Sequence, residues 1–252
     1  MELYISDSIL EKLLFDDIQY VDLTTGVLGI GSVEGVARVF FRENGVVACS
    51  EEASRIYELA GARVKYFVGS GEWVQANQLV LEAQGKSSSL HLAWRVAQTL
   101  LSYASGVATY TRRMVEKAKR SNPGVVIATT RQTPPGTRPF YIKAVLAGGG
   151  IVHRQSLSDS ILIFDNHLVF LEEHGVSGAV KRALKLGGGR SVGIEVKDIE
   201  EAIEAVESGA YYIQFDRVQP NILKDWVKKI RELSSRVVIG VGGGITIENI
   251  EE

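Results

Sequence analysis

From residue 125 to the end of the chain, short apolar runs alternate regularly with helix-length amphipathic segments. Each run is short enough for a buried strand, and the apolar residues of each following segment recur at helical spacing. Repeated units of this kind favour a parallel sheet with right-handed crossovers, and closure into a barrel is the common solution. The predicted strands span 125–129, 160–164, 191–196, 211–215 and 236–241, and the predicted helices span 177–186, 199–208 and 221–233.

Residues 1–110 lack this rhythm, and helix and strand signals follow one another irregularly. A long helix begins near Ser88, its apolar pattern is interrupted at Gly106, and it ends before Pro123. We therefore predict an α/β protein in which an N-terminal α+β sandwich over residues 1–110, including the long helix that leads to the barrel, precedes a TIM-like open α/β barrel of parallel strands over residues 111–252. Because the chain stops just after the last predicted strand, we expect a further helix and strand beyond it.

Bulk properties exclude several classes of protein. The formal net charge of -2 gives no general attraction to nucleic acid or to an anionic membrane. No run approaches the roughly 18 apolar residues of a membrane span, and the N-terminus lacks a basic signal-peptide head. We therefore expect a cytoplasmic protein. The single cysteine, Cys49, excludes an intramolecular disulfide and a cysteine-rich metal site, and its apolar neighbours favour a buried side chain.

Cationic side chains gather around a Pro-Pro-Gly turn directly after the first predicted strand of the barrel. Parallel α/β folds place ligands where strands end, and arginine binds carboxylate or phosphate through two parallel hydrogen bonds. The pattern predicts an anion site, with ordinary surface charges as the alternative. Its candidate residues are Arg131, Arg138, Lys143, His153 and Arg154.

Two carboxylates and a glycine triplet follow later strands. Glu195 and Asp216 end consecutive predicted strands, so they could converge on sugar hydroxyls or on Mg²⁺. A surface role stays open for Asp216 and is weaker for Glu195, which interrupts an apolar run. Gly242, Gly243 and Gly244 lie between a strand and a predicted helix start, where backbone N–H groups bind phosphate. Triple glycine also occurs twice elsewhere in the chain, so the motif alone is a weak signal.

The predicted site combines cations for an acid, carboxylates for ribose or Mg²⁺, and backbone amides for phosphate. Together these groups fit one reaction class. That class transfers a phosphoribosyl group from a pyrophosphorylated ribose to a small anionic acceptor. The motifs also resemble the quinolinate phosphoribosyltransferase (nicotinate-nucleotide pyrophosphorylase) family over nearly the whole chain. The matching segments are 22–25, 105–109, 130–138, Lys143 with the following Ala-Val, 148–154, 165–167, Glu195, 215–216 and 242–245.

The resemblance implies a Mg²⁺-dependent pentosyltransferase that uses phosphoribosyl pyrophosphate. It also implies a homodimer in which Arg95 of one subunit reaches the site of the other. By the same resemblance Arg131 binds the acid, Glu195 and Asp216 bind ribose and Mg²⁺, and the glycine loop binds phosphate. His153 and Arg154 correspond to the family's His-Arg pair.

Two departures bear on the acceptor. The family usually has lysines where this chain has Gln132 and Phe164, and both lysines help to bind the two carboxylates of quinolinate. Without them a buried dianion lacks two positive charges. A third departure is Lys197, where the family often has an acid. These features bring the chain closest to the family's ModD branch, which is named for an association with molybdenum transport.

The leading expectation is therefore phosphoribosyl transfer to a small acid or heterocycle other than quinolinate, because Phe164 offers a ring face. The first alternative is quinolinate turnover itself, in NAD biosynthesis. The second is a binding protein that senses a phosphorylated metabolite or oxyanion without chemistry, and intact Glu195 and Asp216 argue against it.

Overall fold

The computed structural model describes residues 3–171 and 175–252. The chain divides into two compact units, residues 1–153 and 154–252, and each has its own hydrophobic core. The division falls later than the domain boundary predicted near residue 110, because α5 (Arg138–Ala147) packs against α4 (Ser87–Ser121) in the N-terminal unit.

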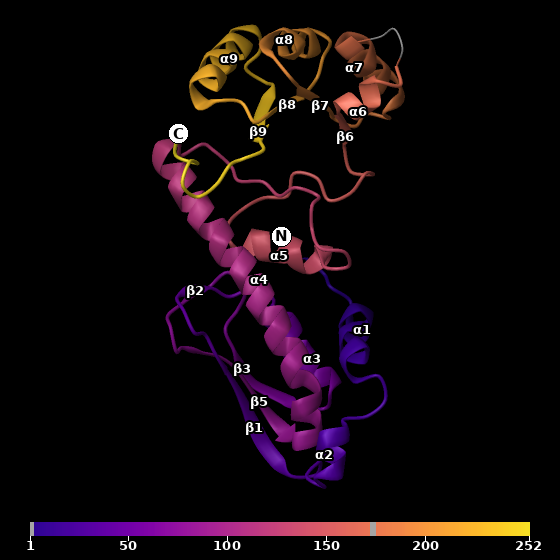
Figure 1. Cartoon of the computed structure of the whole chain (residues 1–252), viewed down its shortest axis with the longest axis vertical. Coiled ribbons are helices and arrows are strands. Elements are labelled where there is room, and N and C mark those ends of the chain that lie inside the picture. Colours follow the sequence, from indigo (N-terminus) through magenta and orange to yellow (C-terminus); the bar gives the residue numbers. More distant parts are fainter. Residues whose placement is uncertain (1–2, 172–174) are drawn as a thin grey trace. The chain divides into compact units, whose positions relative to one another are not determined.

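The N-terminal unit is built on an antiparallel sheet of order β1-β5-β3, beside a separate two-stranded pair, β2-β4. Helices α3 and α4 pack together and lie against the sheet (Figure 1). In chain order the elements before α4 are α1 (Asp7–Ile18), α2 (Leu23–Val27), β1 (Glu34–Phe40), β2 (Gly45–Val46), α3 (Ser50–Leu59), β3 (Arg63–Phe67), β4 (Trp73–Val74) and β5 (Leu79–Lys86).

Helix α4 runs without a break through Gly106, so the interruption expected there is absent. Its buried side is rich in small residues, which allows α5 to approach closely. At Gly148, the last turn of α5 lies so near α4 that an added Cβ would overlap the backbone of Ala108 and the side chain of Thr111. Small residues on α4 thus allow the C-terminal end of α5 to lie against the long helix.

The strand predicted over residues 125–129 is wrong. Only a single parallel bridge forms, between Ala128 and Ile151, and Thr129 N–H donates to the Ile151 carbonyl at 2.9 Å. The run is not buried as a central strand would be, since Val126 is 54% exposed. The cationic loop therefore follows a bridge within the N-terminal unit.

The C-terminal unit confirms the parallel α/β pattern. Its four-stranded parallel sheet has the order β6-β7-β8-β9, and α7, α8 and α9 lie side by side on one face (Figure 1). Among the described residues these strands form an open sheet, and closure into a barrel stays a prediction. The elements are β6 (Ile161–Ile163), α6 (Asp165–Leu168), α7 (Gly175–Leu186), β7 (Val192–Val196), α8 (Ile199–Glu207), β8 (Tyr212–Asp216), α9 (Pro220–Leu233) and β9 (Val238–Gly242).

No helix in the described ranges combines the length and the apolar composition that a bilayer crossing requires.

Candidate active site

The parallel sheet has one apolar face and one polar face. Val192, Ile194 and Phe215 lie in the core with the buried residues of α7, α8 and α9. Because side chains alternate along a strand, Glu195 and Asp216 point to the opposite face of the sheet. The carboxylates predicted to converge therefore share the face of the sheet opposite α7, α8 and α9.

Glu195 is held by a side chain from the neighbouring strand. Gln214 lies opposite Glu195 in the parallel register, and its Nε2 donates to the Glu195 carboxylate at 2.6 Å. Tyr212 O–H in turn donates to Gln214 Oε1 at 3.2 Å. Burial raises the pKa of Tyr212, and the nearby Glu195 carboxylate adds to the rise. Gln214 was not among the predicted site residues, although its place two residues before Asp216 on the same strand puts it on the same face.

Asp216 lies beside the glycine loop. It pairs in register with Gly242, and the backbone N–H of Arg217 donates to the Gly242 carbonyl at 2.9 Å. Gly243 and Gly244 adopt φ values of 75° and 73°, which favour glycine. Residues 247–251 form turns, and Ile250 N–H donates to the Thr246 carbonyl at 3.1 Å, so the helix start predicted after the loop stays a prediction.

Gly243→Ala should impair phosphate binding much more than Gly242→Ala. At Gly243 a side chain is strained by the positive φ and would overlap the Asp216 carboxylate, whereas a Cβ at Gly242 meets nothing within 4 Å. We expect at least a tenfold higher KM for phosphoribosyl pyrophosphate in Gly243→Ala, since about 1.4 kcal/mol of backbone strain suffices for that factor. Steady-state pyrophosphate release measures it, and equal KM values for the two variants would contradict the assignment of this loop.

Phe164 follows β6 directly and begins the short helix α6. Extending the register of β6 and β7 by one residue places it beside Glu195. Its backbone N–H donates to His167 Nδ1 at 3.0 Å, and the two rings stack with centroids 5.8 Å apart. His167 was not among the predicted site residues, and the structure shows it bonded to the Phe164 backbone and stacked on the Phe164 ring.

Lys197 lies two residues beyond Glu195. Its ammonium pairs with Asp165 at 2.9 Å, and both side chains are exposed. This departure from the family pattern thus forms a surface ion pair on the segment next to Phe164.

The loop before α5 is shaped by its own hydrogen bonds. Thr137 N–H and Oγ1 both donate to the Pro134 carbonyl, at 3.1 and 2.7 Å, and Gly136 takes a positive φ of 78°. Arg131, Gln132 and Arg138 are exposed on this loop and at the start of α5. The predicted acid-binding loop therefore presents two arginines and one neutral amide.

Lys143 lies in a buried ionic cluster. Its ammonium contacts both carboxylate oxygens of Glu52 at 2.7 Å and the Glu51 carboxylate at 2.9 Å. The Lys143 and Glu52 side chains are only 17% and 9% exposed. Burial lowers the pKa of Lys143, but hydrogen bonds to Glu52 and Glu51 outweigh burial and raise it. The positive charge that was expected to bind an acid is thus matched by two carboxylates.

Glu51 extends this cluster to a loop of the N-terminal unit. Its carboxylate accepts hydrogen bonds from the backbone N–H and the hydroxyl of Ser70, at 2.8 and 2.5 Å. Burial raises the pKa of Glu51, but the hydrogen bonds from Ser70 and Lys143 dominate and lower it to about 2. The cluster therefore joins α3, α5 and the residue 70 turn.

The remaining predicted residues lie in both units. Arg95 is exposed on α4, donates to Gln98 Oε1 at 3.1 Å and has its guanidinium 4.9 Å from the Trp94 ring centroid. His153 ends the N-terminal unit, and the following Arg154 is 7% exposed with its Nε donating to the Ser156 carbonyl. The N-terminal unit thus carries Arg95, Arg131, Gln132, Arg138, Lys143 and His153, and the C-terminal unit carries Arg154, Phe164, Glu195, Asp216, Gly242, Gly243 and Gly244.

The polar face suits a hard cation that also binds substrate. Among the described residues no group of three or more His, Cys, Asp or Glu side chains is arranged to hold a metal. Mg²⁺ bound through substrate phosphates needs only one or two carboxylates. Glu195 and Asp216, from adjacent parallel strands, supply oxygen donors of the required type.

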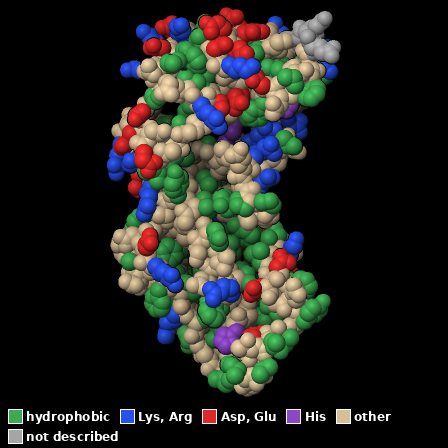
Figure 2. All heavy atoms as spheres, in the orientation of Figure 1, with side chains coloured by type: hydrophobic (Ala, Val, Ile, Leu, Met, Phe, Trp, Pro, Cys, Tyr) green, Lys and Arg blue, Asp and Glu red, His purple; other side chains and the backbone are tan. Residues whose placement is uncertain are grey.

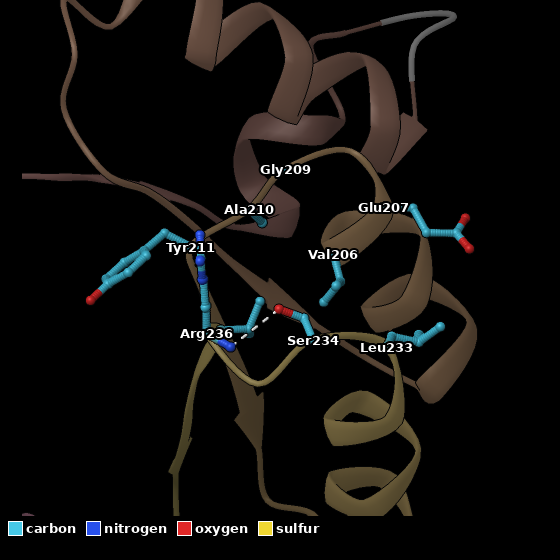
Figure 3. Close-up of a pocket in the computed structure, with 9 residues that line it drawn as sticks. Val206, Glu207, Gly209, Ala210, Tyr211, Leu233, Ser234 and Arg236 are labelled. Atoms are coloured by element: carbon cyan, nitrogen blue, oxygen red, sulfur yellow. Dashed lines mark hydrogen bonds between the residues drawn. The ribbon is translucent and has the colours of Figure 1, made fainter.

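A hollow in the C-terminal unit lies at the amino ends of the strands, at the opposite end from the candidate site. Tyr211, Ser234 and Arg236 line it, on the segments that precede β8 and β9 (Figure 3). Parallel α/β proteins place their active sites at the carboxyl ends of strands. This hollow is therefore not the candidate active site.

Comparison with known proteins identifies the family. Residues 22–105 match the quinolinate phosphoribosyl transferase N-terminal domain, and residues 107–252 match its C-terminal domain. ModD of Rhodobacter capsulatus, which is named as a proposed pyrophosphorylase, is 36% identical over 245 residues, covering 97% of this chain and 94% of that protein. An Archaeoglobus fulgidus protein that carries the name of a carboxylating nicotinate-nucleotide pyrophosphorylase is 36% identical over 230 residues, covering 90% of this chain and 87% of that protein.

Solved structures agree. NadC from Streptococcus pyogenes superposes with a TM-score of 0.90 at 27% identity, covering 99% of this chain and 88% of that one. A NadC deletion mutant gives a TM-score of 0.92 at the same identity, covering 100% of this chain and 87% of that one. Both domain models and these relatives lead to one conclusion: the chain belongs to the quinolinate phosphoribosyltransferase family and is a pentosyltransferase of the pyrophosphorylase type.

Proposed function

We propose that this phosphoribosyltransferase transfers phosphoribose from phosphoribosyl pyrophosphate to a small acid or heterocycle other than quinolinate, with Mg²⁺. One observation carries the proposal. The polar face that would bind the donor keeps Glu195, Asp216 and the glycine loop, whereas the acceptor side has Gln132 and Phe164 in place of two lysines.

The donor chemistry needs positioning and charge rather than a covalent nucleophile. The bond between the anomeric carbon and the pyrophosphate oxygen breaks, and pyrophosphate leaves with the electron pair. The acceptor then donates an electron pair to the anomeric carbon. Glu195, oriented by Gln214 at 2.6 Å, binds ribose hydroxyls and stabilises positive charge at this carbon together with Asp216.

Mg²⁺, held by Glu195 and Asp216, would neutralise the departing pyrophosphate. The amides of Gly243 and Gly244 would bind phosphate oxygens on the same face of the sheet. The donor half of the reaction thus requires only groups that this chain has retained.

The acceptor side is less cationic than the family pattern. Arg131 and Arg138 remain on the loop, but Gln132 is neutral and Phe164 presents a ring that His167 holds in place. Lys143 is matched by Glu51 and Glu52. An acceptor with less negative charge than quinolinate, or with more aromatic surface, fits this set.

Two other functions remain to be tested against this one. Quinolinate turnover is supported by the similarity to the Archaeoglobus fulgidus protein named above. A sensor that binds a phosphorylated metabolite or oxyanion without chemistry would bind ligand but release no pyrophosphate. Cytoplasmic location and any link to molybdenum stay predictions.

A homodimer in which Arg95 enters the neighbouring site forms part of the proposal. Apolar side chains are exposed on α2 and just after it, at the bottom of the view in Figure 2. Leu23, Val27 and Leu28 are 70%, 77% and 63% exposed, and clustered exposure of this kind is typical of an interface. Mixing Arg95→Ala with Arg131→Ala protein should restore activity in mixed dimers if the two residues act across the interface.

Restoring the two family lysines should create or increase quinolinate use. In Gln132→Lys/Phe164→Lys, each ammonium adds a charge-assisted hydrogen bond worth about 1.5–3 kcal/mol to a carboxylate. We expect kcat/KM for quinolinate to rise about tenfold or more, measured by pyrophosphate release and by the pyridine mononucleotide product. Gln132→Met/Phe164→Met is the matched control. An unchanged kcat/KM in the lysine variant would show that these positions do not set acceptor choice.

A further inference from the structure

His91, at the start of α4, is the outer member of a short hydrogen-bonded chain. Asp22 caps α2, accepting from the Thr25 backbone N–H at 3.0 Å and also from the Thr25 hydroxyl. Thr25 Oγ1 lies 2.7 Å from His91 Nδ1. Thr25 is 5% exposed, whereas the His91 side chain is 42% exposed. A buried hydroxyl thus links a carboxylate to a surface imidazole.

The chain of hydrogen bonds determines which ring nitrogen carries the proton. The Thr25 hydroxyl has one proton, and it is donated to Asp22. Thr25 Oγ1 must then accept from His91, so Nδ1 carries hydrogen. Nε2 is left to accept a proton or, when protonated, to donate to an anion. The Asp22 carboxylate lies 4.0 Å from Nδ1.

His91 shares an exposed face of α4 with Arg95. Residues four apart on a helix are neighbours, and Trp94 and Gln98 complete the same face at helical spacing. Trp94 lies under the Arg95 guanidinium, and Gln98 accepts a hydrogen bond from it. The His91 ring and the Arg95 guanidinium on this face are therefore both held by neighbouring side chains.

We propose that His91 is a specificity-determining residue that binds the acid group of the acceptor together with Arg95, at the site of the neighbouring subunit. This rests on the proposed function, which places Arg95 there. The residue set supports it, because the chain has Gln132 and Phe164 in place of two lysines, and a His91 ring can donate to an anion when it is protonated. The exposed apolar residues of α2 follow Asp22 directly, so the network lies beside a surface suited to subunit contact.

Two substitutions separate the role of Nε2 from the structural role of Nδ1. In His91→Asn the side-chain amide N–H replaces Nδ1–H and can still bond Thr25, but nothing replaces Nε2. In His91→Gln the longer amide reaches the position of Nε2. The probe is nicotinate, an aromatic acid with a single carboxylate, titrated calorimetrically into the intact protein without Mg²⁺. Nicotinamide, which lacks the negative charge, is the ligand control.

The proposal predicts that His91→Asn binds nicotinate about tenfold or more weakly than the native protein, since it loses a hydrogen bond to a charged group. His91→Gln should recover part of the affinity, and nicotinamide should bind weakly to all three proteins. Binding of phosphoribosyl pyrophosphate and the thermal midpoint should be the same in native protein and His91→Asn.

Nicotinate that binds equally to native protein and His91→Asn, or that binds to neither, would overturn the role of His91. Failure of this inference is distinguishable from failure of the proposed function. If only the His91 role is wrong, the native protein still releases pyrophosphate from phosphoribosyl pyrophosphate with an acceptor. If the native protein neither binds phosphoribosyl pyrophosphate nor releases pyrophosphate, the proposed function fails and the role of His91 fails with it.

Discussion

Lys143→Met should lower the free energy of unfolding by about 3–5 kcal/mol, because it leaves the buried Glu52 carboxylate without its counter-charge. The Glu52 side chain is 9% exposed, and the Lys143 ammonium contacts both Glu52 carboxylate oxygens at 2.7 Å. Methionine keeps most of the apolar stem, so packing changes little. Urea denaturation of the native and variant proteins measures the difference.

A matched control and a double variant make this test specific. Lys197→Met breaks the exposed pair with Asp165 and should cost less than about 1 kcal/mol. Glu52→Gln in the Lys143→Met background removes the stranded charge and should restore part of the lost stability. Equal effects of Lys143→Met and Lys197→Met would contradict the buried cluster.

Asp216→Asn and Glu195→Gln should each lower kcat for pyrophosphate release by about 10²–10³-fold, the usual range for removing one preorganised electrostatic contact to a transition state. Both side chains lie on the polar face of the sheet, and neither belongs to the apolar core of its unit. Thermal unfolding should therefore shift little. Both amides keep the shape of the acid and remove its charge.

Glu200→Gln is the control for these variants, because Glu200 is an exposed acid on α8 at the other end of the loop that follows β7. It should leave kcat unchanged. If Asp216→Asn and Glu195→Gln also retained native kcat, the two carboxylates would have no part in the reaction, and the assignment of the polar face would be wrong.

Local patterns predicted the C-terminal unit well. Its strands are apolar runs bounded by helix ends and turns, and each lies within about two residues of its predicted range. The same reasoning was wrong at residues 125–129, where an apolar run forms only one bridge. A short run does not reveal whether partner strands flank it on both sides, because those partners are set by the rest of the fold.

Site chemistry was predictable where it follows strand alternation. Glu195 and Asp216 lie on one face because parallel strands place residues in register, and the same rule would have found Gln214. The partners of Lys143 could not be predicted in this way, since Glu52 is 91 residues away in the chain. The link between Asp22, Thr25 and His91 is hidden for the same reason, because Thr25 and His91 are 66 residues apart.

The proposed function is tested by pyrophosphate release from phosphoribosyl pyrophosphate with Mg²⁺, measured with quinolinate and, in parallel, with a panel of small aromatic acids and heterocycles. We expect acceptor-dependent release with at least one member of the panel, formation of the corresponding ribonucleotide, and little or no stimulation by quinolinate. Strong stimulation by quinolinate with nicotinate mononucleotide as product would contradict the altered acceptor site and show that Gln132 and Phe164 are compatible with quinolinate.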